Sequence, residues 1–305
     1  MRIEAAVAST GYTINQAARS LRLRAAKTIL IALPNIGNPY YSTVLDAVIH
    51  EAATRGYGAL VANRLGHDPT QWLKDYFFSN RADGLLLFDS SLDLDVLHDL
   101  PFNNGILPLV LSCDEIPTAD FNMVMTDNFA ASERATQHLI DLGHRDIGHL
   151  RKRMINNLDN QRLLGFRSAM AKAGLPVREE WVFPGDYSMN SGVAAAQHFL
   201  GISDRPSAVY CGNDEMAIGF MSSLNKAGVV CPRDISVIGF DDISVAEHYL
   251  PALTTMRQPR HAMGKAATAA LLDILEGRQD PSTTTRIVLP SEIVIRGSTA
   301  AYRSN

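Results

Sequence analysis

The sequence predicts an α/β protein made of two doubly wound parallel-sheet lobes. First, apolar runs of about five residues alternate with helical segments that end in glycine, which is typical of βα units and a parallel sheet. Second, the ten runs are more than one doubly wound sheet usually holds. Third, 305 residues with 46% hydrophobic side chains are enough for two domains that each bury a core.

The ten apolar runs are the predicted strands, and they divide into two sets of five near residue 126. The first set is Ile29–Leu33, Ala59–Ala62, Leu85–Phe88, Leu109–Leu111 and Met123–Met125. The second set is Ile147–Leu150, Trp181–Phe183, Ala208–Cys211, Ser236–Phe240 and Leu253–Met256. Two similar lobes are the simplest arrangement of these sets.

Apolar stripes at helical spacing mark helices between the strands, and a glycine, which can adopt the left-handed conformation that stops a helix, ends each of them. These glycines are Gly56, Gly143 and Gly174. A late helix over Gly264–Gly277 and closing strands at Arg286–Leu289 and Ile293–Ile295 return the chain across the lobes. The predicted domains are a leader (1–14), a linker helix (15–27), a first lobe (28–126 plus 258–285) and a second lobe (127–257 plus 286–305).

The linker helix is basic and follows a leader with one short amphipathic helix over residues 2–10. The first 28 residues hold five basic and one acidic side chain, net +4, whereas the rest hold 23 basic and 31 acidic, net −8. Asn15 can cap the linker helix, which is too short to be stable alone in water. A polyphosphate such as nucleic acid is the first candidate partner, and an ordinary basic surface helix is the alternative.

Several classes of protein and site are disfavoured. The sequence has no apolar run of 18 residues and no signal-peptide pattern, so we expect a cytoplasmic protein without a membrane partner. The scattered Cys113, Cys211 and Cys231 indicate buried thiols, and the histidines at 138, 144 and 149 lack metal-site spacing. Nucleotide-binding and hydrolase motifs are absent. We therefore predict no catalytic residue, metal or cofactor, and no enzyme.

Polar and aromatic residues gather directly after the predicted strands, where ligands bind in open parallel sheets. They are Asn35–Tyr41, Asp89–Ser91, the segment leading to Arg162, Gly185–Tyr187, Gly212–Asp214 and Gly239–Asp242. Carboxylates, an amide and a guanidinium beside aromatic rings suit a polyol. Each has a structural alternative, since Asn213 and Asp214 can cap the next helix and Asp241–Asp242 can form a turn.

These segments resemble the LacI/GalR family of transcriptional regulators from Arg2 to about Ser298. GYTINQAARSLR resembles the end of the family's DNA-binding domain and its hinge helix, and ILIALPNIGNPYY its first sensor strand and cleft loop. The remaining matches follow in the family's order: Asp141–Arg145, Arg162–Phe166, Cys211–Asp214, Val237–Asp242 and Leu253–Pro259.

The resemblance implies periplasmic-binding-protein-like lobes, a homodimer and residue roles. The effector-binding residues would be Arg162, Asn213 and Asp241 as a clamp, Tyr187 as an aromatic cover, and Gln258, Tyr40, Tyr41 and Asp89 as further contacts. The DNA-binding residues would be Asn15, Ala18, Arg19, Leu21 and Arg22, with Leu21 wedged between base pairs from the minor groove. The effector, a sugar or sugar derivative, would close the lobes and change the affinity for operator DNA.

Two departures from the family's pattern leave alternatives open. Only the third helix of the helix-turn-helix domain is found, around Arg2–Thr10, so the recognition helix that reads bases is missing from this sequence. The sequence then reflects a misplaced or cut start, or a short relative that binds sugar without reading DNA. In addition, Arg151–Met154 after the sixth strand is basic. This segment is either a solvated loop or a feature that attracts an anionic effector.

Overall fold

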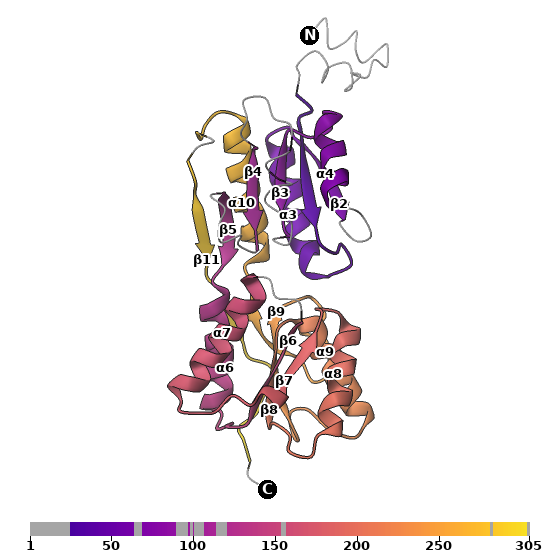
Figure 1. Cartoon of the computed structure of the whole chain (residues 1–305), viewed down its shortest axis with the longest axis vertical. Coiled ribbons are helices and arrows are strands. Elements are labelled where there is room, and N and C mark those ends of the chain that lie inside the picture. The colour runs from indigo at the N-terminus through magenta and orange to yellow at the C-terminus, as the bar shows by residue number, and fades with distance from the viewer. Residues whose placement is uncertain are drawn as a thin grey trace, which may run out of the picture.

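The computed structural model describes residues 25–63, 69–89, 97, 100, 107–113, 121–153, 157–280 and 283–303. Within them the chain forms two α/β lobes stacked end to end, which confirms the predicted fold (Figure 1). The leader, most of the predicted linker helix and all five predicted DNA-binding residues lie outside the described residues. None of the described helices is long and apolar enough to span a membrane.

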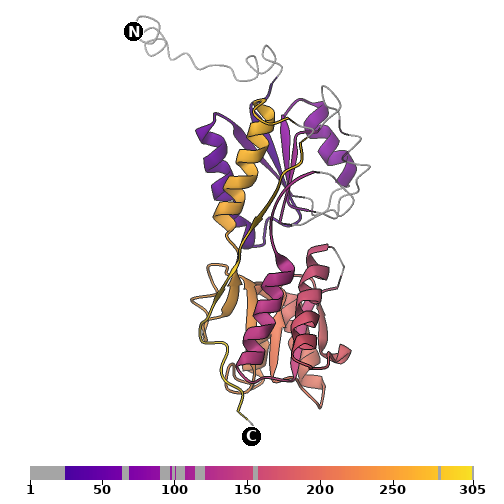
Figure 2. The same cartoon turned by 90° about the vertical axis from the view of Figure 1, so that its left-hand side faces the viewer.

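The first lobe contains a six-stranded, entirely parallel sheet with strand order β11-β5-β4-β3-β1-β2. Its strands are β1 (Thr28–Leu33), β2 (Gly58–Asn63), β3 (Gly84–Leu87), β4 (Leu109–Ser112), β5 (Asn122–Thr126) and β11 (Arg286–Leu289). Its helices are α3 (Tyr40–Thr54), α4 (Pro69–Phe78) and α10 (Arg260–Leu275). Helices α3 and α10 cover one face of the sheet and α4 the other (Figure 2).

The second lobe repeats this plan with strand order β12-β10-β9-β8-β6-β7, in which β12 alone is antiparallel to its neighbour. Its strands are β6 (Ile147–Lys152), β7 (Val182–Gly185), β8 (Ala208–Cys211), β9 (Ser236–Asp241), β10 (Thr254–Arg257) and β12 (Glu292–Val294). Helices α6 (Asn128–Asp141) and α7 (Asn157–Lys172) cover one face, and α8 (Met189–Gly201) and α9 (Asp214–Lys226) the other. A short 3-10 turn, Glu179–Trp181, precedes β7.

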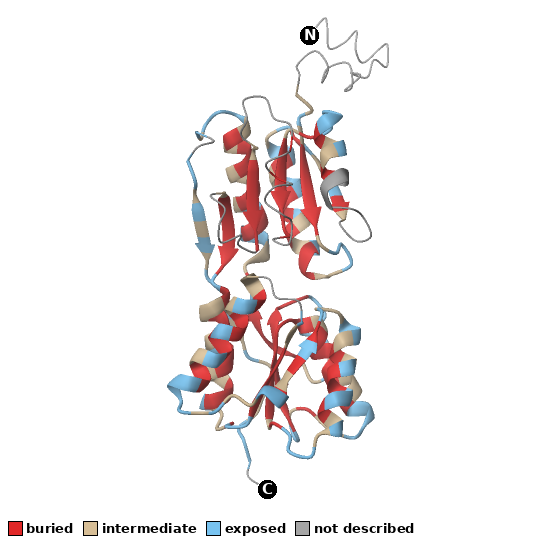
Figure 3. Ribbon diagram, in the orientation of Figure 1, coloured by how far each residue is buried: buried red, intermediate tan, exposed pale blue. Residues whose placement is uncertain are grey.

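Alternation along the central strands explains why both faces of each sheet are covered. In β1, Ile29 and Ile31 pack under α3 and α10, whereas Leu30 packs under α4. In β8, Tyr210 packs under α6 and α7, whereas Val209 faces α8 and α9. Successive strand side chains point to opposite faces, so a wholly apolar strand must be buried on both sides. The central strands are accordingly buried and the outer helix faces exposed (Figure 3).

Glycines let neighbouring helices approach closely in both lobes. A Cβ atom added at Gly264 of α10 would lie 2.5 Å from the Val44 carbonyl oxygen of α3. In the second lobe, a Cβ at Gly192 of α8 would lie 2.1 Å from the Met216 oxygen, and one at Gly165 of α7 would lie 2.3 Å from the Phe129 oxygen. No larger residue fits at these contacts without moving a helix.

The chain crosses between the lobes between β5 and α6, between β10 and α10, and between β11 and β12 (Figure 2). Strand β11 therefore belongs to the first lobe, and the prediction that residues 286–305 lie wholly in the second lobe is wrong for Arg286–Leu289. Its backbone pairs in parallel with β5, with Arg286 opposite Met123, and completes an otherwise open sheet edge. The sequence of a four-residue edge strand does not indicate which of the two sheets the strand will join.

Strand β6 is also longer than predicted. Arg151 and Lys152 continue the strand, because they pair with Pro184 and Gly185 of β7, and only Arg153 lies beyond it among the described residues of the basic segment. The prediction of a loop immediately after Leu150 is therefore wrong. The charged side chains concealed the strand, because apolarity was the feature used to locate strands.

Candidate functional site

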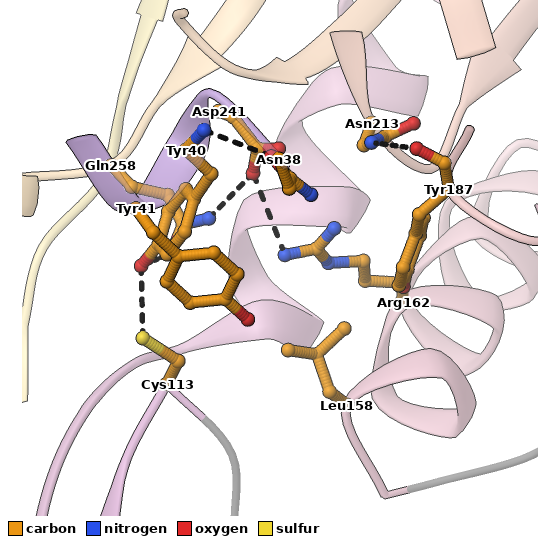
Figure 4. A pocket seen from close by; sticks show the side chains of 10 residues that line it. All are labelled: Asn38, Tyr40, Tyr41, Cys113, Leu158, Arg162, Tyr187, Asn213, Asp241 and Gln258. Atoms are coloured by element: carbon orange, nitrogen blue, oxygen red, sulfur yellow. Dashed lines mark hydrogen bonds and ion pairs between the residues drawn. The ribbon is translucent and has the colours of Figure 1, made fainter. Parts of the chain in front are cut away.

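A cavity lies between the lobes, at the carboxyl ends of the parallel strands (Figure 4). It is lined by Asn38, Tyr40, Tyr41, Cys113, Leu158, Arg162, Tyr187, Asn213, Asp241 and Gln258. The first four come from the first lobe, Gln258 from the crossing between β10 and α10, and the others from the second lobe. This placement agrees with the rule that ligands bind beyond the carboxyl ends of parallel strands.

Arg162 is the central cation of the cavity and is only 4% exposed. Its Nε donates to Asn128 Oδ1 at 3.0 Å and its Nη1 donates to the Gly212 carbonyl oxygen. The guanidinium also lies 3.7 Å from the centre of the Phe240 ring. These contacts hold the guanidinium plane still, and its Nη2, 3.9 Å from Asp241 Oδ1, faces the cavity. A buried charge held in this way is prepared to bind a polar ligand.

Asp241 ends strand β9 in a backbone conformation that is rare for residues other than glycine, with φ of +121°. Its Oδ1 accepts a hydrogen bond from Gln258 Nε2 at 2.7 Å. Burial raises the pKa of this carboxyl to about 6, although the Arg162 charge and the Gln258 hydrogen bond act in the opposite direction. The site therefore holds a carboxylate whose charge is costly without further partners.

Tyr187 forms the aromatic wall on the second-lobe side. Its backbone has φ of +71°, and the Asn213 amide donates to its carbonyl oxygen at 3.0 Å. Its hydroxyl donates to the carboxylate of Asp159 in α7. The ring is therefore fixed from both ends, with its centre 5.8 Å from the Arg162 guanidinium.

Asn213 and Asp214 both have structural roles at the start of α9. The Asn213 side chain caps the helix by accepting from the Met216 amide at 3.0 Å, which confirms the capping alternative for this residue. Asp214 is fully buried and accepts from Thr255 Oγ1 at 2.6 Å and from the Ile243 amide at 2.9 Å. Asp214 thus joins α9 to the ends of β9 and β10.

The first lobe contributes mainly neutral aromatic groups. The rings of Tyr40 and Tyr41 meet edge to face with centres 5.1 Å apart. The Tyr40 hydroxyl lies 3.0 Å from Cys113 Sγ and donates to Gln258 Oε1 at 3.5 Å. Burial raises the pKa of Tyr40 well above its ordinary value, so this phenol stays neutral. A chain of contacts thus leads from the first lobe through Gln258 to Asp241.

Seven of the eight predicted effector-binding residues line the cavity; the exception is Asp89, which is buried just beyond β3. Contact of these residues with an effector stays a prediction. Sequence reasoning included Asn38 only as part of the segment Asn35–Tyr41, and it did not single out Cys113 or Leu158. The position of Cys113 directly after β4, the same strand-end signal, could have identified it, whereas Leu158 carries no signal beyond its place in α7.

His144, His149 and the three cysteines are buried in the folded lobes. His144 lies within hydrogen-bonding distance of Ser207 and Ser236, at 2.9 and 3.0 Å. His149 is buried between aromatic rings, and burial lowers its pKa to about 3. All three cysteines are buried thiols, and within the described ranges no group of His, Cys, Asp or Glu side chains could hold a metal ion.

Comparisons with known proteins agree with this architecture. A model of the periplasmic binding protein-like domain family matches residues 136–299. The HTH-type transcriptional repressor PurR of Photobacterium profundum is 35% identical over 302 residues, covering 97% of this chain and 88% of PurR. PurR of Yersinia pestis is 36% identical over 284 residues, covering 92% and 82%.

Two solved structures are similar over nearly their whole length. A LacI family transcriptional regulator from Enterococcus faecium with bound ribose has a TM-score of 0.83 and 25% identity, covering 90% of this chain and 100% of that one. The complex of the transcriptional regulator CelR with cellobiose has a TM-score of 0.81 and 28% identity, covering 97% and 89%.

Proposed function

This chain belongs to the LacI/GalR family of transcriptional regulators, and we propose that it is a repressor whose affinity for operator DNA is controlled by a small effector bound between its lobes. The observation that carries the proposal is the cavity itself, which joins buried polar groups of the second lobe to aromatic groups of the first. A ligand that contacts both walls stabilises one relative position of the lobes.

A sugar or sugar derivative is the effector class that best suits the groups available. Asp241 Oδ2 and Arg162 Nη2 make no hydrogen bond among the described residues, so both remain to bind hydroxyls. The rings of Tyr41 and Tyr187 offer apolar faces to the carbon side of a sugar ring. Ribose and cellobiose in the two similar structures support this class.

Control of DNA affinity would follow from lobe closure. The three chain crossings form a hinge, and the contacts from Tyr40 through Gln258 to Asp241 lie beside one of them. An effector clamped by Arg162 and Asp241 would draw the first lobe onto the second. In a homodimer this motion changes the separation of the two segments that precede β1, and therefore the stability of hinge helices at the DNA.

The DNA contacts themselves remain those that the resemblance implies. The DNA would be contacted by Asn15, Ala18, Arg19, Leu21 and Arg22, with Leu21 entering the minor groove. A protein that binds operator DNA acts on the chromosome, so we propose that it is located in the cytoplasm. We also propose that it is a homodimer, as the family resemblance implies.

The proposal is tested by selecting genomic DNA fragments with the purified protein, with and without a panel of sugars and sugar derivatives. We expect a small set of fragments to be enriched and at least one compound to change that enrichment. Leu21→Ala should reduce enrichment without altering ligand binding. If no fragment is enriched under any condition, regulation of transcription by this chain is refuted even if ligands bind.

A further inference from the structure

We propose that the effector carries an oxyanion group, a phosphate or a carboxylate, that binds beside the carboxyl end of β6, where Lys152 lies over the Tyr187 wall of the cavity and Arg151 occupies the other face of the strand. This inference rests on the proposed function, since it specifies the chemistry of the effector of that same site. The basic pair, as we call Arg151 and Lys152, is not among the residues that line the cavity itself.

The basic pair has no acidic partner within the described part of the chain. Neither side chain, nor that of the adjacent Arg153, comes within 4.0 Å of a carboxylate oxygen there. Arg151 Nη2 is moreover buried and has no hydrogen-bond partner among the described residues. Arg167 of the same lobe, by contrast, is paired with Glu179 at 2.6 Å. A buried guanidinium nitrogen without an acceptor is costly, and a ligand oxyanion would remove that cost.

The acidic groups nearest the basic pair are engaged by hydroxyl and amide donors instead. Asp159 accepts from the Tyr187 hydroxyl, and Asp186 accepts from the Ser188 amide at 2.9 Å and from the Ser188 hydroxyl at 2.5 Å. The charge of Lys152 acts on both carboxylates without forming an ion pair with either. The positive charge at this end of β6 is therefore not cancelled by direct contact.

The basic pair adjoins the cavity through Tyr187. Lys152 Nζ lies 5.4 Å from the centre of the Tyr187 ring, which the Arg162 guanidinium approaches to 5.8 Å. Two cations thus flank the aromatic wall. On the other face of β6, the charge of Arg151 acts together with that of Arg162 on Asp159. A ligand substituent that passes the edge of Tyr187 would meet positive charge on each side.

The hydrogen-bonding groups left in the cavity also favour an acceptor-rich ligand. Arg162 Nη2, Asn38 Nδ2 and the second hydrogen of Asn213 Nδ2 make no hydrogen bond among the described residues. Asp241 Oδ2 also makes no hydrogen bond among the described residues. The unengaged donor hydrogens of Arg162, Asn38 and Asn213 can bind the oxygen atoms of a phosphate or a carboxylate.

The test compares charged and neutral forms of one sugar. Affinities for glucose, glucose 6-phosphate and gluconate, and for ribose and ribose 5-phosphate, are measured by calorimetry on the full chain, with inorganic phosphate alone as a further probe. We expect one charged sugar to bind at least about tenfold more tightly than its neutral parent at low salt. The advantage should shrink as salt is raised, because exposed parts of the interaction are screened.

Variants locate the effect. Arg151→Gln and Lys152→Gln should each remove most of the charged sugar's advantage and leave the affinity for the neutral parent unchanged, whereas Lys152→Arg should keep it. Lys226→Gln is the matched control, since it removes one exposed cation at the end of α9. Thermal unfolding of each variant verifies that it is folded.

The outcomes separate the two proposals. If a neutral sugar binds as tightly as its charged form and the Gln variants change nothing, the oxyanion proposal is overturned while the proposed function stands. If inorganic phosphate alone binds with the affinity of the sugar phosphate, the site is an anion site without sugar selectivity, which also overturns it. If no compound of the panel binds, the sugar effector of the proposed function fails together with this inference.

Discussion

The two lobes share one architecture but contribute different chemistry to the cavity between them. The second lobe supplies the charged and amide groups Arg162, Asp241 and Asn213, each tied by hydrogen bonds to its own lobe or to the adjacent crossing. The first lobe supplies the aromatic side chains of Tyr40 and Tyr41. From this difference we infer that recognition of the proposed effector is built into the second lobe before the effector binds, and that the first lobe closes over it.

Arg162→Ala tests this division with the largest expected effect. The substitution removes the fixed guanidinium and leaves Asn128 and the Gly212 carbonyl without their donor. We expect effector affinity to fall by about 2–5 kcal/mol, measured by calorimetry with the tightest ligand of the sugar panel. Arg167→Ala is the matched control on the same helix, because Arg167 forms an exposed pair with Glu179. Equal affinity losses in both variants would contradict a role of Arg162 at the ligand.

Gly192→Ala tests whether close helix packing supports the second lobe as strongly as the first. Its Cβ would meet the Met216 carbonyl at 2.1 Å, so we expect a loss of about 1–3 kcal/mol in the free energy of unfolding by urea. Gly264→Ala should cost a similar amount in the first lobe. Gly201→Ala, at the end of α8 with open space around it, is the control. A cost at Gly201 as large as at Gly192 would exclude helix packing as the reason.

Asp241→Asn should raise stability while weakening ligand binding. Burial raises the pKa of Asp241 to about 6, above the value of about 3.9 for an unfolded chain. The folded state then binds the proton more tightly, so this group's contribution to stability falls as pH rises from about 4 to about 6 and stays low above that. The neutral Asn removes this penalty and should add on the order of 1 kcal/mol at pH 7.5.

The comparison between Asp241→Asn and the wild type is made by urea unfolding at several pH values. Taking the difference cancels the titration of groups that do not interact with Asp241, such as His149, whose pKa burial lowers to about 3. The titration of Asp214 does not cancel, because the Asp241 charge adds to the effect of burial in raising its pKa. A variant less stable than the wild type at pH 7.5 would mean that attraction to Arg162 outweighs the cost of burying the charge.

Tyr40→Phe should have the smallest effect. It removes the hydroxyl that contacts Cys113 and Gln258 and keeps the ring, so effector affinity should fall by about 0.5–1.5 kcal/mol with little change in unfolding temperature. Calorimetry on the same ligand gives the comparison with Arg162→Ala. A loss as large as that of Arg162→Ala would show that the first lobe recognises the ligand as strongly as the second.

Much of the fold and the cavity could be predicted because their signals are local. The apolar runs and the glycines after the helices located the strands and helices, and the strand-end rule selected Arg162, Tyr187 and Asp241. The predictions failed where the signal was not local. The sequence places strand β11 in the wrong lobe, although β11 pairs with β5. It also predicts a loop at Arg151 and Lys152, because these residues are charged, although both pair with β7.

The sequence by itself determined the two lobes, their parallel sheets and the polar edge that faces the cavity, because these follow from periodicity and from residue types next to each other in the chain. Only the tertiary structure decided which of the strand-end residues meet. It placed Cys113 beside Tyr40, left Asp89 outside the cavity lining, and joined the Tyr187 hydroxyl to Asp159. Those contacts join residues far apart in the sequence, and their geometry depends on how the lobes pack rather than on any local pattern.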